Sequence, residues 1–476
     1  MKALKYLFVG VLALTMSTVA LAQNDHKAVI DQLTKIISSD AADKDAQVKA
    51  IFKDYKKDPD VMIGIGRAYF NIQDYTTAQT YVDMALKRDR TYGEAYILAG
   101  DIYVANDNGG AASAQFEQAI YYEPKNPNGY RRYAQVNSKA NPAASVAKLE
   151  ELRAQLPEYP VDLIAADIYD KAGNITEALK YYEKVDKDKM EDYQLVNFAL
   201  AYFLKGKFDN SLEVSIFGNK KFPRNAALNR ITFFDLTNLQ KYPEALLAAD
   251  ALFNRSDSTK ITSSDYLYYG YAYLGNKEYD NAVTMFEKSI AANDGNEADR
   301  IDALKNISEA YKQKGDYPQA ISTYETYLAA LKTQTALDIN ALAQLYMAEA
   351  ADTTNSDMQS KQLYLKADGI YADMVAKFPS VAIFATLQRA HIAFALDPES
   401  TDGLAKPHYE KIITLVNEKE EKEANDNARL IEAYRYLGYY YLVIKDDETN
   451  GKAYWQKILD LDPDNVQAKQ ALGIAE

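Results

Sequence analysis

The chain has 476 residues with a formal net charge of −14, no cysteine, 48% hydrophobic and 26% charged residues. The lack of cysteine excludes disulfides, thiolate metal sites, a cysteine nucleophile and a thioether lipid anchor. The acidic balance argues against nucleic acid as a partner, because binding to phosphates needs clustered Lys and Arg. The hydrophobic share is enough for a continuous core beneath an ordinary charged surface.

Residues 1–22 have the pattern of a cleavable signal peptide, with a positive start, an apolar centre and small residues before the cleavage point. These parts are Lys2 and Lys5, residues 7–14, and Ala20 and Ala22. We expect cleavage after Ala22, which leaves Gln23 as the N-terminus of a periplasmic or secreted protein without a lipobox cysteine. The alternative is an uncleaved membrane anchor, but the apolar stretch is shorter than the roughly 20 residues that a spanning helix needs. No later apolar run approaches that length, so we expect no transmembrane segment in the mature chain.

Residues 23–58 are expected to form an N-terminal capping helix pair. The amphipathic pattern predicts helices at Asp25–Ser38 and Lys44–Lys57. Ser39, Asp40 and Asp43 between them are typical turn and cap residues.

From Asp60 onward, one residue pattern returns at a period of about 34 positions almost to the C-terminus. In many units a small residue is followed twelve positions later by Ala or Ser. These pairs are Gly66 and Ala78, Gly100 and Ala112, Ala166 and Ala178, Ala199 and Ser211, and Gly270 and Ala282. Small residues at this spacing predict a close crossing of two antiparallel helices, where larger side chains would push the helices apart.

One unbroken unit consists of Tyr96, Gly100, Tyr103, Ala112, Phe116, Ala119, Pro124 and Asn126. These residues match the aromatic, small, Ala, Pro and Asn positions of the tetratricopeptide repeat (TPR), so the chain resembles the TPR family. With its signal peptide, it resembles exported TPR proteins of Gram-negative bacteria, of a Bacteroidota-like kind. The resemblance implies an all-α fold, a right-handed superhelical solenoid of antiparallel helix pairs with about eleven repeats and terminal capping helices. It also implies that most of the 39 tyrosines pack where the helices cross.

The economical domain assignment is one continuous solenoid. It has a TPR array at residues 59–351, a loop insertion or soft joint at 352–362, and C-terminal TPR units with a capping helix at 363–476. Two arrays that move about the joint are the alternative. The charged stretch Glu418–Asp426 is interpreted as a solvated helix end and loop, with an acidic docking site as its alternative.

No arrangement of residues in the sequence predicts catalysis. The only imidazoles are His26, His391 and His408, and the sequence has no HExxH zinc motif, no GxSxG nucleophile elbow and no Walker loop. Residues 107–110, Asp-Asn-Gly-Gly, superficially resemble a calcium loop, but the alternating oxygen ligands and terminal Glu are missing, so we interpret them as a tight turn. We therefore expect no catalytic residue, no metal, no cofactor and no enzymatic activity.

The resemblance also indicates where a partner would bind, because in TPR proteins the first helix of each pair lines a concave groove. The positions that point into this groove predict an apolar and aromatic patch in three consecutive units. The patch consists of Tyr193, Val196, Leu200, Phe203, Arg230, Phe234, Leu267, Tyr271 and Leu274. Such a surface suits an extended or helical peptide. The alternative is that these side chains pack between successive repeats.

We therefore expect a non-catalytic scaffold or adaptor in the cell envelope, which binds a protein or peptide partner in its groove and assists the assembly of envelope complexes. The partner's identity and the oligomeric state are left open. A second hypothesis is binding of carbohydrate or cell-wall polymer, with Tyr193, Tyr271 and Tyr439 as stacking platforms.

Overall fold

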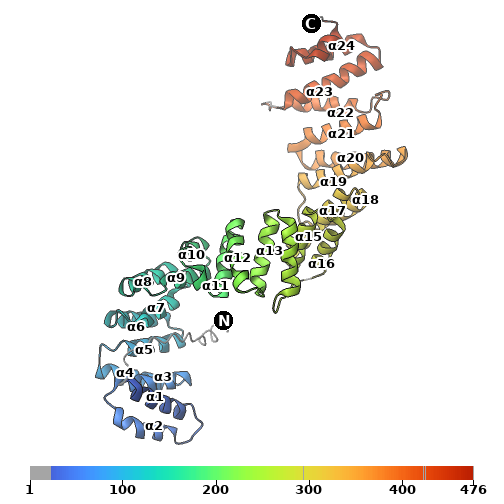
Figure 1. Ribbon diagram of the computed structural model, residues 1–476. Coiled ribbons are helices and arrows are strands. Elements are labelled where there is room, and N and C mark those ends of the chain that lie inside the picture. Colours follow the sequence, from blue (N-terminus) through green and yellow to red (C-terminus); the bar gives the residue numbers. More distant parts are fainter. Residues whose placement is uncertain (1–22, 293, 422, 424, 475–476) are drawn as a thin grey trace. The chain divides into compact units, whose positions relative to one another are not determined.

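The computed structural model describes residues 23–474 except 293, 422 and 424 (Figure 1). The predicted signal peptide, with Ala20 and Ala22, lies outside the described residues. The described part of the chain is all-α and contains no β-strand. It divides into two compact units, one up to Phe222 and one from Pro223, and each is described by itself.

The first unit contains twelve α-helices among its described residues. They are α1 (Gln23–Ile37), α2 (Lys44–Phe52), α3 (Pro59–Asn71), α4 (Tyr75–Arg88), α5 (Gly93–Ala105), α6 (Gly109–Tyr122), α7 (Pro127–Asn137), α8 (Pro142–Gln155), α9 (Val161–Lys171), α10 (Ile175–Tyr182), α11 (Asp192–Leu204) and α12 (Phe208–Lys221). The capping pair of the sequence analysis is present as α1 and α2, although α2 ends five residues before the predicted Lys57 and a 3₁₀ turn follows at Lys53–Tyr55.

The described residues of the second unit contain thirteen α-helices. They are α13 (Ala226–Asn238), α14 (Tyr242–Asp250), α15 (Ser263–Gly275), α16 (Tyr279–Ala291), α17 (Glu297–Lys314), α18 (Tyr317–Ala330), α19 (Ala336–Ala350), α20 (Asp357–Lys377), α21 (Ala382–Leu396), α22 (Lys406–Asn417), α23 (Asp426–Tyr439), α24 (Glu448–Leu461) and α25 (Val466–Leu472). Residues 352–362, the predicted soft joint, lead from α19 into α20 within this unit, and their role as a joint stays a prediction.

Within each unit, successive helices pack as pairs, for example α3 with α4 and α15 with α16 (Figure 1). The predicted small residues lie where the two helices of a pair meet. A Cβ atom added to Gly100 would collide with the Phe116 ring, and one added to Gly270 would collide with Phe286. In another pair the Ser211 hydroxyl donates to the backbone carbonyl of Ala199 across the crossing, at 2.9 Å. The prediction of close helix crossings is therefore confirmed.

The turn between the helices of a pair is built in the same way in several units. A residue with positive φ ends the first helix, and an Asp or Asn side chain then caps the second. Asp107 has a φ of 55°, and the Asn108 side chain accepts a hydrogen bond from the Ala111 backbone at 3.1 Å. Gly173 and Asn174 repeat this arrangement before α10. Asp107 and Asn108 thus form the tight turn that the sequence predicts, and Gly109 and Gly110 begin α6.

Tyrosines contribute much of the core. Tyr182 and Tyr371 are fully buried, and stacked or edge-on pairs such as Tyr69 with Tyr81 join neighbouring helices. Aromatic pairs of this kind stabilise a fold beyond the area that they bury. None of the described helices is long and apolar enough to cross a membrane.

Candidate functional site

The predicted groove residues belong to both units and have different surroundings in each. Four of them lie on α11 in the first unit, and the other five lie on α13 and α15 in the second. These helices are the first members of their pairs, as the resemblance implies. The two groups are therefore compared separately.

One side of α11 is buried and the other is exposed. Leu195, Phe198, Ala199 and Tyr202 pack into the core of the first unit. On the other side, Tyr193 is 50% exposed, Leu200 39% and Leu204 61%. Leu204 was missed by the sequence analysis, because it is the last residue of the helix and lies outside the groove positions of the repeat.

Val196 and Phe203 complete this side of α11 as half-buried residues. The Phe203 ring meets Phe208 of α12 edge-on, with ring centroids 5.5 Å apart. We refer to Tyr193, Val196, Leu200, Phe203 and Leu204 as the α11 surface. It is a continuous side of one helix, since these residues follow the three- and four-residue spacing of a helix.

Asp167 of the preceding first helix, α9, contacts the α11 surface, and Asp170 lies one helical turn further along the same side of α9. The Tyr193 hydroxyl is 3.5 Å from Asp167 Oδ2, and the Tyr182 hydroxyl donates to Asp167 Oδ1 at 3.2 Å. Burial raises the pKa of Asp167, although Lys171 opposes the effect. Burial also raises the pKa of Asp170, and the charge of Asp167 adds to it.

Arg230, on α13 in the second unit, is engaged in packing between successive helix pairs. Its guanidinium donates to both carboxylate oxygens of Asp265, at 2.6 and 2.9 Å, and to the backbone carbonyl of Lys260 at 3.0 Å. Asp265 is fully buried and also accepts a hydrogen bond from the Thr262 backbone at 2.9 Å as α15 begins. Arg230 therefore ties α13 to α15.

The apolar groove residues of the second unit pack in a similar way. The Phe234 ring stacks on Tyr268 of α15, with centroids 3.8 Å apart and an angle of 14° between the planes. The Tyr271 hydroxyl donates to Asp302 of α17, and Leu274 packs against the local core. Leu267 is only 4% exposed, so its assignment to an open groove is wrong: it lies in the core that α15 forms with α16 and α17.

The tyrosines proposed as carbohydrate platforms are in different environments. Tyr193 and Tyr439 are exposed, whereas Tyr271 is half-buried and its hydroxyl is occupied by Asp302. Burial and this carboxylate raise the pKa of Tyr271 above its ordinary value. Tyr271 is therefore part of the packing between helix pairs.

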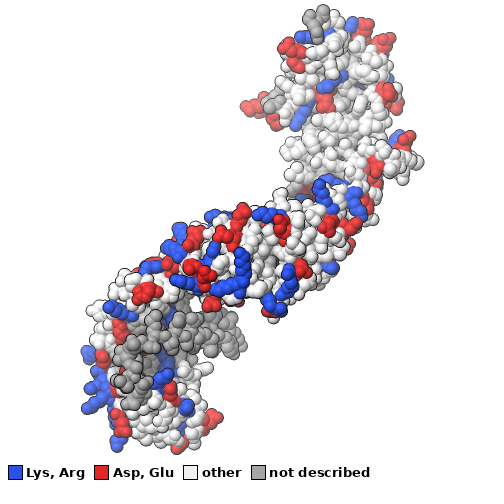
Figure 2. Space-filling model, viewed as in Figure 1, with Lys and Arg blue, Asp and Glu red and all other residues white. Residues whose placement is uncertain are grey.

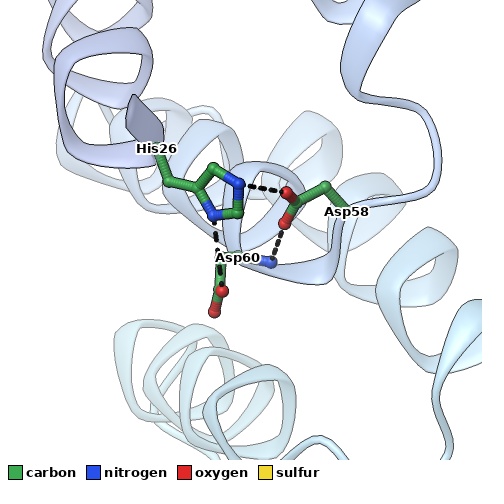
Figure 3. A group of neighbouring side chains, drawn as sticks. All are labelled: His26, Asp58 and Asp60. Carbon is green, nitrogen blue, oxygen red and sulfur yellow. Dashed lines mark hydrogen bonds and ion pairs between the residues drawn. The ribbon is translucent and has the colours of Figure 1, made fainter. Parts of the chain in front are cut away.

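His26 lies between two carboxylates at the start of α3 (Figure 3). Its Nε2 is 2.9 Å from Asp58 Oδ2, and its Nδ1 is 3.7 Å from Asp60 Oδ2. Among the described residues, these three form the group whose side chains could together hold a metal ion. Their potential ligand atoms lie within 4.8 Å of one another. However, each ring nitrogen faces a different carboxylate, while a single ion takes one nitrogen from a histidine. The other oxygen of Asp58 caps α3 by accepting from the Asp60 and Val61 backbones. The arrangement is that of an imidazole bridging two carboxylates and tying α1 to α3.

The other two histidines lie on α21 and α22. His391 Nε2 is 2.7 Å from Glu432 Oε1, which also accepts from the Tyr409 hydroxyl at 3.1 Å. Burial, followed by the nearby Arg389 charge, lowers the pKa of His408. Neither imidazole is hydrogen-bonded to a Ser or Thr hydroxyl within the contacts described for this part of the chain, so the geometry of an activated nucleophile is not assembled around them.

Charged side chains of both signs are interspersed over the face of the molecule in Figure 2. Some charged side chains of the first unit form ion pairs between successive repeats. Arg67 pairs with Asp101, which is almost fully buried, and Arg132 lies 3.2 Å from the same carboxylate. These pairs connect neighbouring helix pairs in the way that Arg230 and Asp265 do.

Comparison with known protein families matches three segments of the chain. Residues 263–333 match one model of the tetratricopeptide repeat, and residues 93–126 and 163–187 match another. These matches support the tetratricopeptide repeat family. The TPR segments include α9 and α15, which carry Asp167 and Tyr271.

Among solved structures, the C-terminal part of a TPR repeat-containing protein from Cytophaga hutchinsonii is similar at 25% identity, covering 65% of this chain and 99% of that chain, with a TM-score of 0.41. A tetratricopeptide repeat protein from Parabacteroides merdae is similar at 16% identity, covering 52% and 98%, with a TM-score of 0.33. YrrB, described as a TPR protein with an unusual peptide-binding site, is similar at 18% identity, covering 38% and 94%, with a TM-score of 0.31. No match was found among the curated proteins.

Proposed function

We propose that this protein is a non-catalytic scaffold that binds a protein or peptide partner through the α11 surface. The observation that carries the proposal is the exposure of Tyr193, Leu200 and Leu204 on one side of a helix whose other side already fills the core. An exposed apolar stripe with polar neighbours is typical of a surface that another chain covers. A partner helix or extended segment could bury these three side chains together.

The energetic reason is the apolar area that remains in contact with water. Burial of such area contributes roughly 25 cal/mol of stabilisation per Å². Tyr193, Leu200 and Leu204 do not gain this stabilisation in full, because their side chains stay exposed to water. In the second unit, Phe234 is covered by Tyr268 and Leu267 by its own core. Between these predicted groove helices, α11 therefore leaves more apolar area for a partner to bury.

We further propose that the protein works in the cell envelope of a Gram-negative bacterium and assists assembly of envelope complexes there. The support is the signal-peptide pattern of residues 1–22, with Lys2, Lys5, Ala20 and Ala22 at the characteristic positions. N-terminal sequencing of the protein from a periplasmic fraction should read Gln23 first. Recovery of the full-length chain in the cytoplasm would contradict this location.

A site-specific photo-crosslinking experiment tests the binding surface. A photoreactive residue at Leu204 should crosslink to the physiological partner in cells, whereas the same residue at Leu247 should not. Leu247 is the matched control because it is an even more exposed leucine, on the second helix of a pair. Equal crosslinking from both positions, or a partner captured from Leu247 alone, would contradict the assignment to α11.

A further inference from the structure

The α9 carboxylates Asp167 and Asp170 differ from Asp162 of the same helix in their charged partners. Asp167 and Asp170 are one helical turn apart and so lie on the same side of α9. The ion pairs that α9 forms with Arg153 and Lys184 both go to Asp162. Neither Asp167 nor Asp170 forms an ion pair with a described residue.

The groups around these two carboxylates leave a net negative charge. The Tyr182 hydroxyl of α10 and the Tyr193 hydroxyl of α11 contact Asp167, and the Gln194 amide donates to the Tyr193 hydroxyl at 3.0 Å. Lys171 is the cation on the same helix, and its charge only partly offsets the burial that raises the pKa of both carboxyls. Two partly buried like charges raise the free energy of the folded protein, and a cation placed between them would lower it.

Tyr193 joins these carboxylates to the apolar part of the α11 surface. Its ring is half exposed and its hydroxyl reaches Asp167, so an incoming cation would find carboxylates and an aromatic ring together. Leu200 and Leu204 lie seven and eleven residues further along the helix, which at 1.5 Å per residue is about 10 and 16 Å. An extended peptide advances about 3.3 Å per residue, so these distances correspond to about three to five residues.

We propose that the partner segment places a Lys or Arg side chain against Asp167 and Asp170, and an apolar side chain three to five residues away against Leu200 and Leu204. This inference rests on the proposed function and adds the chemistry of the partner. It favours a basic-apolar peptide over an acidic one, because the carboxylates would repel the latter.

Binding of a fluorescein-labelled dodecapeptide tests this. The peptide has Lys four residues before Leu in a Gly, Ser and Asn background, and matched peptides replace Lys by Gln or Glu. We expect the Lys peptide to bind at least tenfold more tightly than the Gln peptide, and the Glu peptide to bind most weakly. Asp170→Asn should remove the preference for Lys, while Asp162→Asn, a change on the same helix at a carboxylate already paired with Arg153, should leave it unchanged.

The outcomes separate this inference from the proposed function. One outcome is that the Lys and Gln peptides bind equally well and that Leu204→Glu weakens the binding of each. This would overturn the basic-apolar chemistry and leave the α11 surface as the binding site. Binding of all peptides that is insensitive to Leu204→Glu, or no binding up to millimolar concentration, would overturn both. Preference for Lys should also weaken as the pH falls toward the ordinary Asp value of 3.8, because the carboxyls lose their charge.

Thermal unfolding gives a readout that a structural role would not produce. Asp170→Asn should raise the melting temperature at neutral pH, because it removes an uncompensated charge, even as it removes the preference for Lys. A lower melting temperature for Asp170→Asn, together with loss of binding, would show that Asp170 supports the fold and would contradict its role as a cation acceptor.

Discussion

The first helices α11 and α13 both carry predicted groove residues, yet the side chains of the two helices meet different surroundings. On α13, Phe234 stacks on Tyr268 and Arg230 is held by the buried Asp265. On α11, Tyr193 and Leu204 remain largely exposed. The difference teaches that a predicted groove residue is available to a partner only where no other side chain of the fold covers it.

The largest effect is expected from removing the buried partner of Arg230. Asp265→Ala leaves a guanidinium without its carboxylate and removes the Asp265 side-chain half of the capping box of α15, so it should lower the free energy of unfolding by about 3 kcal/mol. Chemical denaturation of the purified protein measures this change. Asp257→Ala serves as the control, because Asp257 pairs with Arg224 at an exposed position and should have little effect. Equal effects of the two substitutions would show that Arg230 is not a structural tie.

A smaller loss is expected from the aromatic stack of the second unit. Phe234→Ala removes a half-buried ring from its contact with Tyr268 and should lower the free energy of unfolding by about 2 kcal/mol. The same denaturation measurement checks the value. If Phe234→Ala left stability unchanged, α13 would resemble α11 and the comparison would fail.

The pH dependence of stability tests the carboxylates beside α11. The pKa of Asp170 is raised in the folded state, so its carboxyl disfavours folding increasingly as the pH rises from the unfolded pKa to the folded pKa, and fully above the latter. Below the unfolded value both states are protonated and the penalty is absent. Asp170→Asn should therefore stabilise the protein at pH 7, and this gain should disappear as the pH approaches 3.8. Calorimetry of both proteins across this pH range checks the prediction. A gain in stability that does not depend on pH would contradict it.

The smallest effect on stability is expected on α11 itself. Leu204→Ala removes a side chain that is mostly in water, so the melting temperature should stay within about 1 °C of the wild type. A clear decrease in the melting temperature would mean that Leu204 belongs to the core of the first unit.

The helix pairs could be predicted from the sequence because their signal is local. Gly100 and Ala112, twelve residues apart, specify the crossing of one pair without reference to any other repeat, and Asn108 specifies the turn between the helices. Residues 352–362 remain a predicted joint, since neither their contacts nor the division of the chain tests that role.

The outcome for individual groove residues could not be predicted from one repeat alone. Whether Arg230 and Tyr271 face a partner depends on Asp265 and Asp302, which lie one repeat further along the chain. The sequence does contain a signal for these contacts between repeats, because residues of opposite charge recur about one repeat apart. Arg67 and Asp101 are separated by 34 residues, and Arg230 and Asp265 by 35. Such spacing indicates ties between repeats, and residues without such a partner, including Leu204, are then the better binding candidates.

The central claim is that α11 binds a partner while the predicted groove residues of α13, Arg230 and Phe234, hold the fold together. The most direct test is the affinity of the Lys-containing peptide for the Leu204→Glu variant, measured by calorimetry and compared with that of the wild-type protein. The melting temperatures of the two proteins are measured as a control for folding. We predict that affinity falls at least tenfold while the unfolding transition is unchanged. Unchanged affinity of the folded variant would contradict the claim.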